Sequence, residues 1–165
     1  MNLIRSFRHL LLPDWFVRRA FARSDLAAIG KAITASEKSH RGELRFVVEA
    51  AMPLAFLWRD LSPRARAVDL FSTLRVWDTA ENSGILIYVQ LVDRRVEILA
   101  DRGIAARVPQ GEWDAICRVM EASFRRGEWQ GGALQAVTRA GELLARHFPA
   151  GASNPNELPD QPLVL

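Results

Sequence analysis

An uncharged run at residues 85–92, Ile-Leu-Ile-Tyr-Val-Gln-Leu-Val, restricts the fold of this chain more than any other feature. Its apolar side chains follow one another without alternating with charged ones, which is typical of a strand buried on both faces. Residues 93–95, Asp-Arg-Arg, then suit a solvated turn, and apolar and polar residues alternate over residues 96–100 as in a half-exposed strand. We therefore predict a hairpin made of a central strand and a more exposed neighbour.

A further strand and a helix precede this hairpin. Residues 44–48 are rich in β-branched and aromatic side chains, and Ser62 followed by Pro63 is a typical helix start. Because a strand–helix–strand order gives a right-handed crossover between parallel strands, residues 44–48 and 85–92 are predicted to be parallel neighbours. The predicted fold is one α/β domain of three layers with a small mixed central sheet, in which a parallel β-α-β unit is followed by the antiparallel hairpin.

The chain divides into three segments by composition. Residues 1–23 form a basic amphipathic arm, residues 24–148 carry the periodic apolar patterns of a folded body, and residues 149–165 are rich in proline. The last segment shows no helical or strand periodicity, so we predict an extended tail and not a packed element. The single cysteine, Cys117, excludes an internal disulfide bond.

The arm holds most of the positive charge. It carries five arginines and one acidic residue, whereas the rest of the chain has a net charge of −1, so we expect no nucleic-acid partner for the body. Two interpretations of its helical pattern stay open: the arm binds an anionic membrane surface, or it packs on the body with its arginines facing water. The residues that would contact a membrane or a partner are Arg5, Arg8, Trp15, Phe16, Arg18 and Arg19.

The hydropathy of the chain bears on its compartment. No apolar stretch approaches the ~20 residues that a membrane-spanning helix needs, and the run at residues 10–12 is too short for the core of a signal peptide. We therefore expect a cytoplasmic protein, with a peripheral position on the inner membrane if the arm binds lipid.

Two polar loops flank the hairpin. Asn-Ser-Gly at residues 82–84 precedes it and Asp-Arg-Gly at residues 101–103 follows it, and an antiparallel pair of strands brings these loops to the same end of the sheet. Four oxygen-bearing side chains are expected to converge there: Asp78, Glu81, Asn82 and Asp101. Such hard oxygen ligands suit Ca²⁺ or Mg²⁺. Ordinary turn chemistry explains the same residues equally well.

The chain ends in Leu163, Val164 and Leu165, three apolar residues that follow a proline-rich stretch. An extended peptide of this kind can add to a sheet edge or lie in a groove, and residues 96–100 are the predicted receptor, in the same molecule or in a neighbour. The alternative is a flexible tail without a partner.

Several motifs together resemble the TPM domain, the family of the thylakoid-lumen acid phosphatase, the photosystem II repair protein and the levamisole-receptor modulator. They are Arg-Val-Trp-Asp-Thr at 75–79, Asn-Ser-Gly-Ile-Leu-Ile-Tyr-Val at 82–89, Asp-Arg at 93–94 and Val-Glu-Ile-Leu-Ala-Asp-Arg-Gly-Ile at 96–104. Ser-His-Arg-Gly-Glu-Leu-Arg at 39–45, Trp113 and the final helix extend the resemblance over roughly residues 25–148. The tail motif Asn-Glu-Leu-Pro-Asp at 156–160 is similar to those of short, stand-alone bacterial members.

This resemblance implies an α/β/α sandwich. Some members of the family bind calcium or have weak acid-phosphatase activity, so the resemblance implies one of these properties here. Many members are also tethered to membranes. The chain departs from the family at Ser83, where an asparagine pair is usual. We carry two functional hypotheses. The first is an accessory protein of membrane-linked protein maintenance, with protein partners and a divalent cation at the loops. The alternative is a weak, cation-dependent acid phosphatase; the sequence shows no nucleophile or general base for it, which favours the first.

Overall fold

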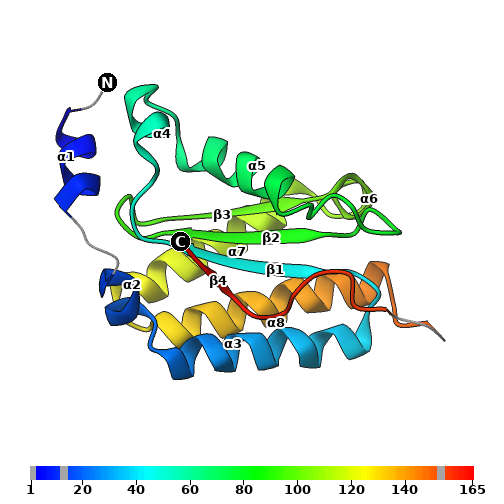
Figure 1. Cartoon of the computed structure of the whole chain (residues 1–165). Helices are drawn as coiled ribbons and strands as arrows, with labels where there is room; N and C mark the ends of the chain where they lie inside the picture. The colour runs from blue at the N-terminus through cyan, green and yellow to red at the C-terminus, as the bar shows by residue number, and fades with distance from the viewer. Residues whose placement is uncertain (1–2, 12–14, 152–154) are drawn as a thin grey trace.

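A computed structural model describes residues 3–11, 15–151 and 155–165; the side chains of residues 3, 4, 15 and 16 are outside the description. One mixed sheet runs through the middle, with helices on both of its faces (Figure 1). The predicted three-layer α/β architecture is confirmed.

The sheet has the strand order β3-β2-β1-β4, formed by β1 (Leu44–Glu49), β2 (Ile85–Gln90), β3 (Arg95–Ala100) and β4 (Leu163–Val164). β1 and β2 are parallel and β2 and β3 are antiparallel, as predicted. Every residue of β2 is buried, which agrees with its unbroken apolar run. The strand ends two residues earlier than the run, because Leu91 and Val92 already belong to the turn.

Long helices cover one face of the sheet, and a shorter helix packs against the other (Figure 1). The first layer consists of α3 (Arg23–Ser36), α7 (Gln110–Arg125) and α8 (Trp129–His147), with the short η1 (Glu37–Ser39) after α3. The second layer is α5 (Pro63–Thr73), whose N-cap Ser62 accepts a hydrogen bond from the amide of Ala65, as its sequence predicts. The remaining helices are α1 (Leu3–Leu11), α2 (Trp15–Ala20), α4 (Leu54–Trp58) and α6 (Arg102–Ala105).

Alternate strand residues supply two separate cores, because successive side chains of a strand point to opposite faces. Phe46, Val48 and Ile87 belong to the larger core, with α3, α7 and α8. Val47 and Tyr88 belong to the smaller core, under α5. A buried ion pair holds α5 against β1, with Arg66 Nη2 2.6 Å from an oxygen of the Glu49 carboxylate.

The C-terminal tail packs on the body. The prediction that it pairs with residues 96–100 was wrong within this molecule, because it pairs with another strand. Leu163 and Val164 pair in parallel with Val47 and Val48 of β1, at the opposite edge of the sheet from residues 96–100. The amide of Leu165 donates to the carbonyl of Val48 at 2.9 Å. The segment before β4 is also packed, since Leu158 is buried in the smaller core.

Two side chains near the start of β1 hold the tail in place. The Glu43 carboxylate accepts hydrogen bonds from the amides of Glu157 and Leu158, at 3.2 and 3.1 Å. Arg45 donates to the carbonyls of Pro159 and Gln161, at 2.6 and 2.7 Å. The proline-rich composition therefore accompanies an ordered strap and not a loose extension.

The acidic groups around this strap predict a stability that falls as the pH rises. Burial, followed by the nearby charges of Glu43 and Asp160, raises the pKa of Glu37 to about 8 from its ordinary 4.5. Burial likewise raises the pKa of Glu43 to about 7, although the two tail amides act in the opposite direction. The folded state thus keeps protons that the unfolded chain has already lost, and stability that is fully present below pH 4.5 is lost as the pH rises through 7 to 8.

We expect the free energy of unfolding to fall by roughly 4 kcal/mol or more between pH 5 and pH 8.5, since each unit of raised pKa corresponds to about 1.4 kcal/mol. Urea unfolding across this range measures it, and Glu37→Gln should flatten the profile because the neutral side chain cannot ionise. Glu142→Gln, on the exposed side of α8, is the matched control and should leave the profile unchanged. A wild-type stability that rises over this range would contradict the prediction.

Candidate functional site

The two loops that flank the hairpin do meet at one end of the sheet. The amide of Asp101 donates to the carbonyl of Gly84 at 2.9 Å, and the amide of Gly103 donates to the carbonyl of Asn82 at 2.9 Å. Asn82 adopts a left-handed backbone with φ of 52°, a conformation that asparagine tolerates better than most residues. The antiparallel pairing of β2 and β3 therefore brings Asn82 and Asp101 together, as their positions in the sequence predict.

The four predicted metal ligands are not equally available. Asp101 is 8% exposed; its Oδ1 accepts from the amide of Arg102 at 2.7 Å, while its buried Oδ2 has no hydrogen-bond partner within the described part of the chain. The Asn82 side-chain oxygen accepts from Arg102 Nε at 2.9 Å. Glu81 forms an ion pair with Arg41 at 2.6 Å, and Asp78 is exposed to solvent.

The fit to a divalent cation is consequently partial. Among residues 3–11, 15–151 and 155–165, no three His, Cys, Asp or Glu side chains gather closely enough to hold a metal ion. Two members of the predicted set could bind a cation without breaking an existing contact. They are Asp101, through its buried Oδ2, and the exposed Asp78. Glu81 and Asn82 would first have to leave their guanidinium partners.

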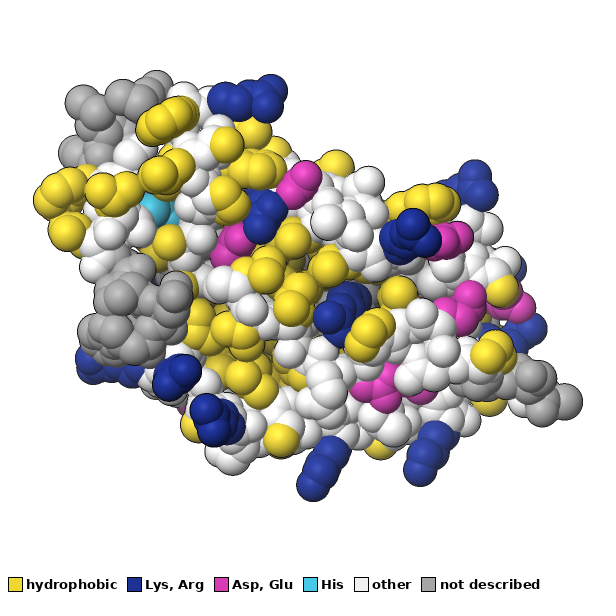
Figure 2. Space-filling view, in the orientation of Figure 1, with side chains coloured by type: hydrophobic (Ala, Val, Ile, Leu, Met, Phe, Trp, Pro, Cys, Tyr) yellow, Lys and Arg dark blue, Asp and Glu magenta, His cyan; other side chains and the backbone are white. Residues whose placement is uncertain are grey.

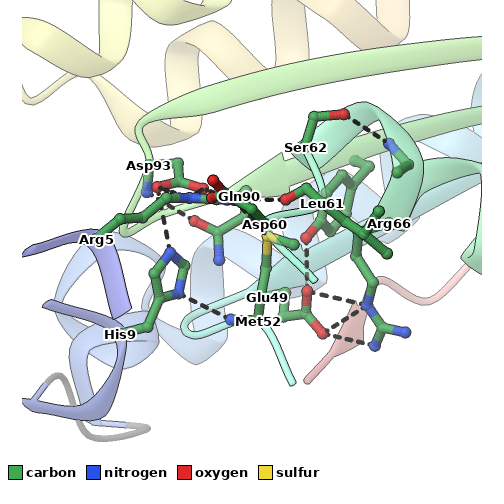
Figure 3. Close-up of polar contacts among 12 residues, drawn as sticks. Arg5, His9, Glu49, Met52, Asp60, Leu61, Ser62, Arg66, Gln90 and Asp93 are labelled. Carbon is green, nitrogen blue, oxygen red and sulfur yellow. Dashed lines mark hydrogen bonds and ion pairs between the residues drawn. The ribbon is translucent and has the colours of Figure 1, made fainter. Parts of the chain in front are cut away.

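The opposite end of the sheet carries a polar cluster that fastens the arm to the body (Figure 3). Arg5 Nη2 lies 2.7 Å from Asp93 Oδ2, and His9 Nε2 lies 3.2 Å from Asp93 Oδ1. The amide of Met52 donates to His9 Nδ1 at 3.0 Å, and Arg5 also donates to the carbonyl of Leu61 at 2.8 Å. We call Arg5, His9 and Asp93 the arm latch.

The latch has a defined protonation pattern. Because His9 Nδ1 accepts from a backbone amide, its Nε2 carries the proton and donates to Asp93. Both ring nitrogens are thus engaged, and His9 positions the arm instead of serving as a general base. Burial alone would raise the pKa of Asp93, but the hydrogen bonds from His9 and Arg5 outweigh it and hold that pKa at about 2.

The expectation of a solvated turn at residues 93–95 was therefore wrong for Asp93, whose side chain is 15% exposed. The sequence pattern also gave no sign of the contact made by His9, which is buried, at 3% exposed. The i, i+4 spacing of Arg5 and His9 places both on one side of α1 and could have indicated a polar contact surface. Nothing near Asp93 in the sequence identifies it as the partner.

The two halves of the arm differ, because Val17 and Phe21 are buried in the larger core while the described apolar side chains of α1 face outward. Phe7, Leu10 and Leu11 of α1 are 63%, 67% and 61% exposed, and Leu54 and Trp58 of the adjacent α4 are 48% and 70% exposed. We call these five residues the α1–α4 apolar face. Figure 2 shows hydrophobic side chains gathered over these two helices. Among the described side chains of α1, Arg5 and His9 thus contact the body while Phe7, Leu10 and Leu11 face solvent, the reverse of an ordinary surface helix.

The predicted arm residues divide accordingly. Arg5 contacts the body, so the expectation of arginines facing water fails for it, whereas Arg8, Arg18 and Arg19 are exposed. The side chains of Trp15 and Phe16 lie outside the described residues. Of the helices that the structure describes, none has the length and apolar character to cross a membrane.

The architecture defines a class: a mixed four-stranded α/β sandwich whose central hairpin is flanked by two paired polar loops. The model of the TPM domain matches residues 18–143, so the chain belongs to the TPM domain family. The motifs quoted above indicated the same family.

A solved structure shares this fold. The NMR structure of the BA42 protein from the psychrophilic bacterium Bizionia argentinensis superposes with a TM-score of 0.77 at 28% sequence identity, over 88% of this chain and 95% of that one. A comparison with curated protein sequences gives no match.

Proposed function

We propose that this protein is an accessory TPM-domain protein that docks on an anionic membrane surface through the α1–α4 apolar face. The observation that carries the proposal is the orientation of α1, which is fastened by Arg5 and His9 and leaves Phe7, Leu10 and Leu11 outside. The latch holds this orientation in the free protein, so the docking surface is preformed.

The apolar character of this face supports a second apolar phase as its partner. Burying a leucine or phenylalanine side chain stabilises by about 1.5–3 kcal/mol, and contiguous exposed apolar patches commonly mark binding surfaces. α1 is short and lies on the outside of the molecule (Figure 1), as does a helix that rests in the plane of a membrane interface.

The charge around the face favours anionic lipid over a neutral surface. Arg8 lies on α1 itself, Arg59 follows Trp58 at the end of α4, and both are exposed. Each basic residue near an anionic bilayer contributes about 1 kcal/mol of attraction. We infer that hydrophobic insertion and this attraction act together, and that the protein serves maintenance of membrane-linked proteins from that position.

Vesicle flotation tests the proposal. We expect the protein to float with vesicles of phosphatidylglycerol and phosphatidylcholine, and less with phosphatidylcholine alone or in high salt. The double variant Phe7→Ser/Leu10→Ser should weaken the affinity for the vesicles by more than about tenfold, since the loss of two apolar anchors exceeds 1.4 kcal/mol.

Val119→Ser is the matched control, because Val119 is 46% exposed on α7, away from the face. It should bind as the wild type does. Equal flotation of the double variant and the wild type would overturn the proposal, and so would wild-type protein that stays at the bottom of the gradient.

A divalent cation at the flanking loops is a second candidate activity, favoured by the buried and unpartnered Oδ2 of Asp101. We propose Asp101 as the anchor for Ca²⁺ or Mg²⁺, with Asp78, Glu81 and Asn82 completing the oxygen set. At 100 times its dissociation constant the ion should stabilise the fold by about 2.7 kcal/mol. Thermal unfolding with and without millimolar Ca²⁺ or Mg²⁺ measures this stabilisation.

Asp101→Asn should remove the response while keeping the helix cap, because asparagine also caps helices. Asp114→Asn, an exposed position on α7, should respond like the wild type. An unchanged melting temperature of the wild type in the presence of either ion would exclude a useful site.

The alternative function, weak hydrolysis of phosphomonoesters, rests on the same cation, which would offset charge on the phosphoryl group. Release of p-nitrophenol from p-nitrophenyl phosphate, measured with Ca²⁺ or Mg²⁺, tests it. Activity that depends on the ion and is lost in Asp101→Asn would support the phosphatase, and equal activity of Asp101→Asn and the wild type would oppose it.

A further inference from the structure

We infer that a cavity beside the hairpin turn binds a compact aromatic carboxylate. The cavity has a volume of about 250 Å³ and lies between the β2–β3 turn, the end of α7 and the start of α8. It is at the other end of the hairpin from Asp101, and the inference does not depend on membrane docking. We call it the turn cavity.

Aromatic side chains form one wall of the turn cavity. Phe124 and Trp129 line it and stack on each other, with ring centroids 4.8 Å apart and an angle of 28° between the ring planes. Phe21, which is 1% exposed, packs edge-on against both at 5.8 Å. The two rings are thus held from behind, and Leu91 of the turn adds a further apolar side chain to the lining.

Positive charge dominates the remainder of the lining. Arg94, Arg95 and Arg125 line the cavity together with a single acidic residue, Glu121. The closest approach of Arg95 to Glu121 is 3.9 Å, and Glu121 Oε1 already accepts from the amide of Val96. Arg94 and Arg125 have no carboxylate partner among the described residues, so an anion would meet two guanidinium groups that are not neutralised.

The turn that carries Arg94 is held in one conformation. Arg94 has a left-handed backbone with φ of 54°, which is unusual for a residue other than glycine or asparagine. Its amide donates to the carbonyl of Leu91 at 3.2 Å, and the amide of Asp93 donates to Gln90 Oε1 at 2.8 Å. The Asp93 side chain also contacts Arg5 and His9 in the arm latch. These contacts hold the backbone of Arg94 beside the cavity that its side chain lines.

Size and chemistry together select the ligand class. An apolar cavity of about 150 Å³ admits benzene, so 250 Å³ accommodates a two-ring system or one ring with a short chain. The aromatic wall suits stacking with a flat ring, and guanidinium groups match the geometry of a carboxylate. A flat aromatic body that carries one carboxylate satisfies both parts of the lining.

Titration with naphthalene-2-carboxylate, followed in ¹H–¹⁵N NMR spectra of the full chain, tests the inference. We expect saturable shifts of the Trp129 indole N–H and of the amides at residues 91–95 and 124–129. Naphthalene-2-methanol, its neutral counterpart, should bind at least about tenfold more weakly because it lacks the charge that the arginines recognise. Added salt should weaken only the carboxylate.

The double variant Arg94→Gln/Arg125→Gln should bring the two probes to equal affinity, and both positions are exposed, so the fold should be retained. Arg118→Gln/Arg146→Gln removes the same charge elsewhere on the surface and is the matched control. The inference is overturned if the carboxylate causes no saturable shifts at the cavity, or if the neutral probe binds wild-type protein equally well.

Discussion

Replacing Asp93 with alanine is expected to release α1 from the body and to lower the free energy of unfolding by about 2–4 kcal/mol. The change leaves the guanidinium of Arg5, which is 18% exposed, and the buried ring of His9 without their shared carboxylate. Urea unfolding measures the loss of stability. Limited proteolysis at the arginines of the arm measures its release.

The pH dependence of the wild type provides an independent check on the latch. The pKa of Asp93 is depressed to about 2 from its usual 3.8, so its contribution to the stability of the fold is fully present above pH 3.8 and is lost as the pH falls through 2.

Glu142→Ala is the matched control for Asp93→Ala, since Glu142 lies on an exposed part of α8. An Asp93→Ala protein with wild-type stability and a protected arm would show that the latch contributes nothing.

Gly84→Ala is expected to lower the free energy of unfolding by more than about 3 kcal/mol, because the added methyl group would clash with the main chain. A Cβ at position 84 would lie 1.9 Å from the carbonyl oxygen of Val76, which belongs to the main chain and cannot rotate away. The loops at 82–84 and 101–103 would have to separate, so any cation response should also disappear. Thermal unfolding with and without Ca²⁺ measures both effects.

Gly111→Ala is the matched control for this substitution. Nothing lies within 4 Å of a Cβ at position 111, which is in the first turn of α7, and alanine has the higher helix propensity. This variant should be as stable as the wild type or slightly more stable. A Gly84→Ala protein that melts with the wild type would show that the loop is free to move away from Val76.

The fold follows from the sequence where local patterns are strong. The uncharged run of β2 and the capped start of α5 identify their elements without reference to the rest of the chain. The position of the tail could not be predicted in this way, because strand addition joins backbone groups, which β1 and β3 offer alike. The β3 edge is already occupied by side chains: Arg64 donates to the carbonyl of Ile98 at 2.7 Å, and Glu121 accepts from Val96.

The candidate sites follow from the sequence only in part. Antiparallel pairing predicts that Asn82 and Asp101 meet. It does not reveal that Glu81 forms an ion pair with Arg41, because these residues are 40 positions apart. The amphipathic pattern of the arm predicts a helix without indicating which side contacts the body. That choice depends on Asp93, which is 88 positions from Arg5.

Lipid contact at single residues tests membrane docking most directly. In ¹H–¹⁵N NMR spectra recorded with bicelles that contain phosphatidylglycerol and a nitroxide-bearing lipid, the amides nearest the membrane lose intensity. Docking through the α1–α4 apolar face predicts that this loss is strongest at residues 7–11 and 54–59 and absent at the loops 78–84 and 101–104. Loss centred on those loops, or no loss anywhere, would contradict it.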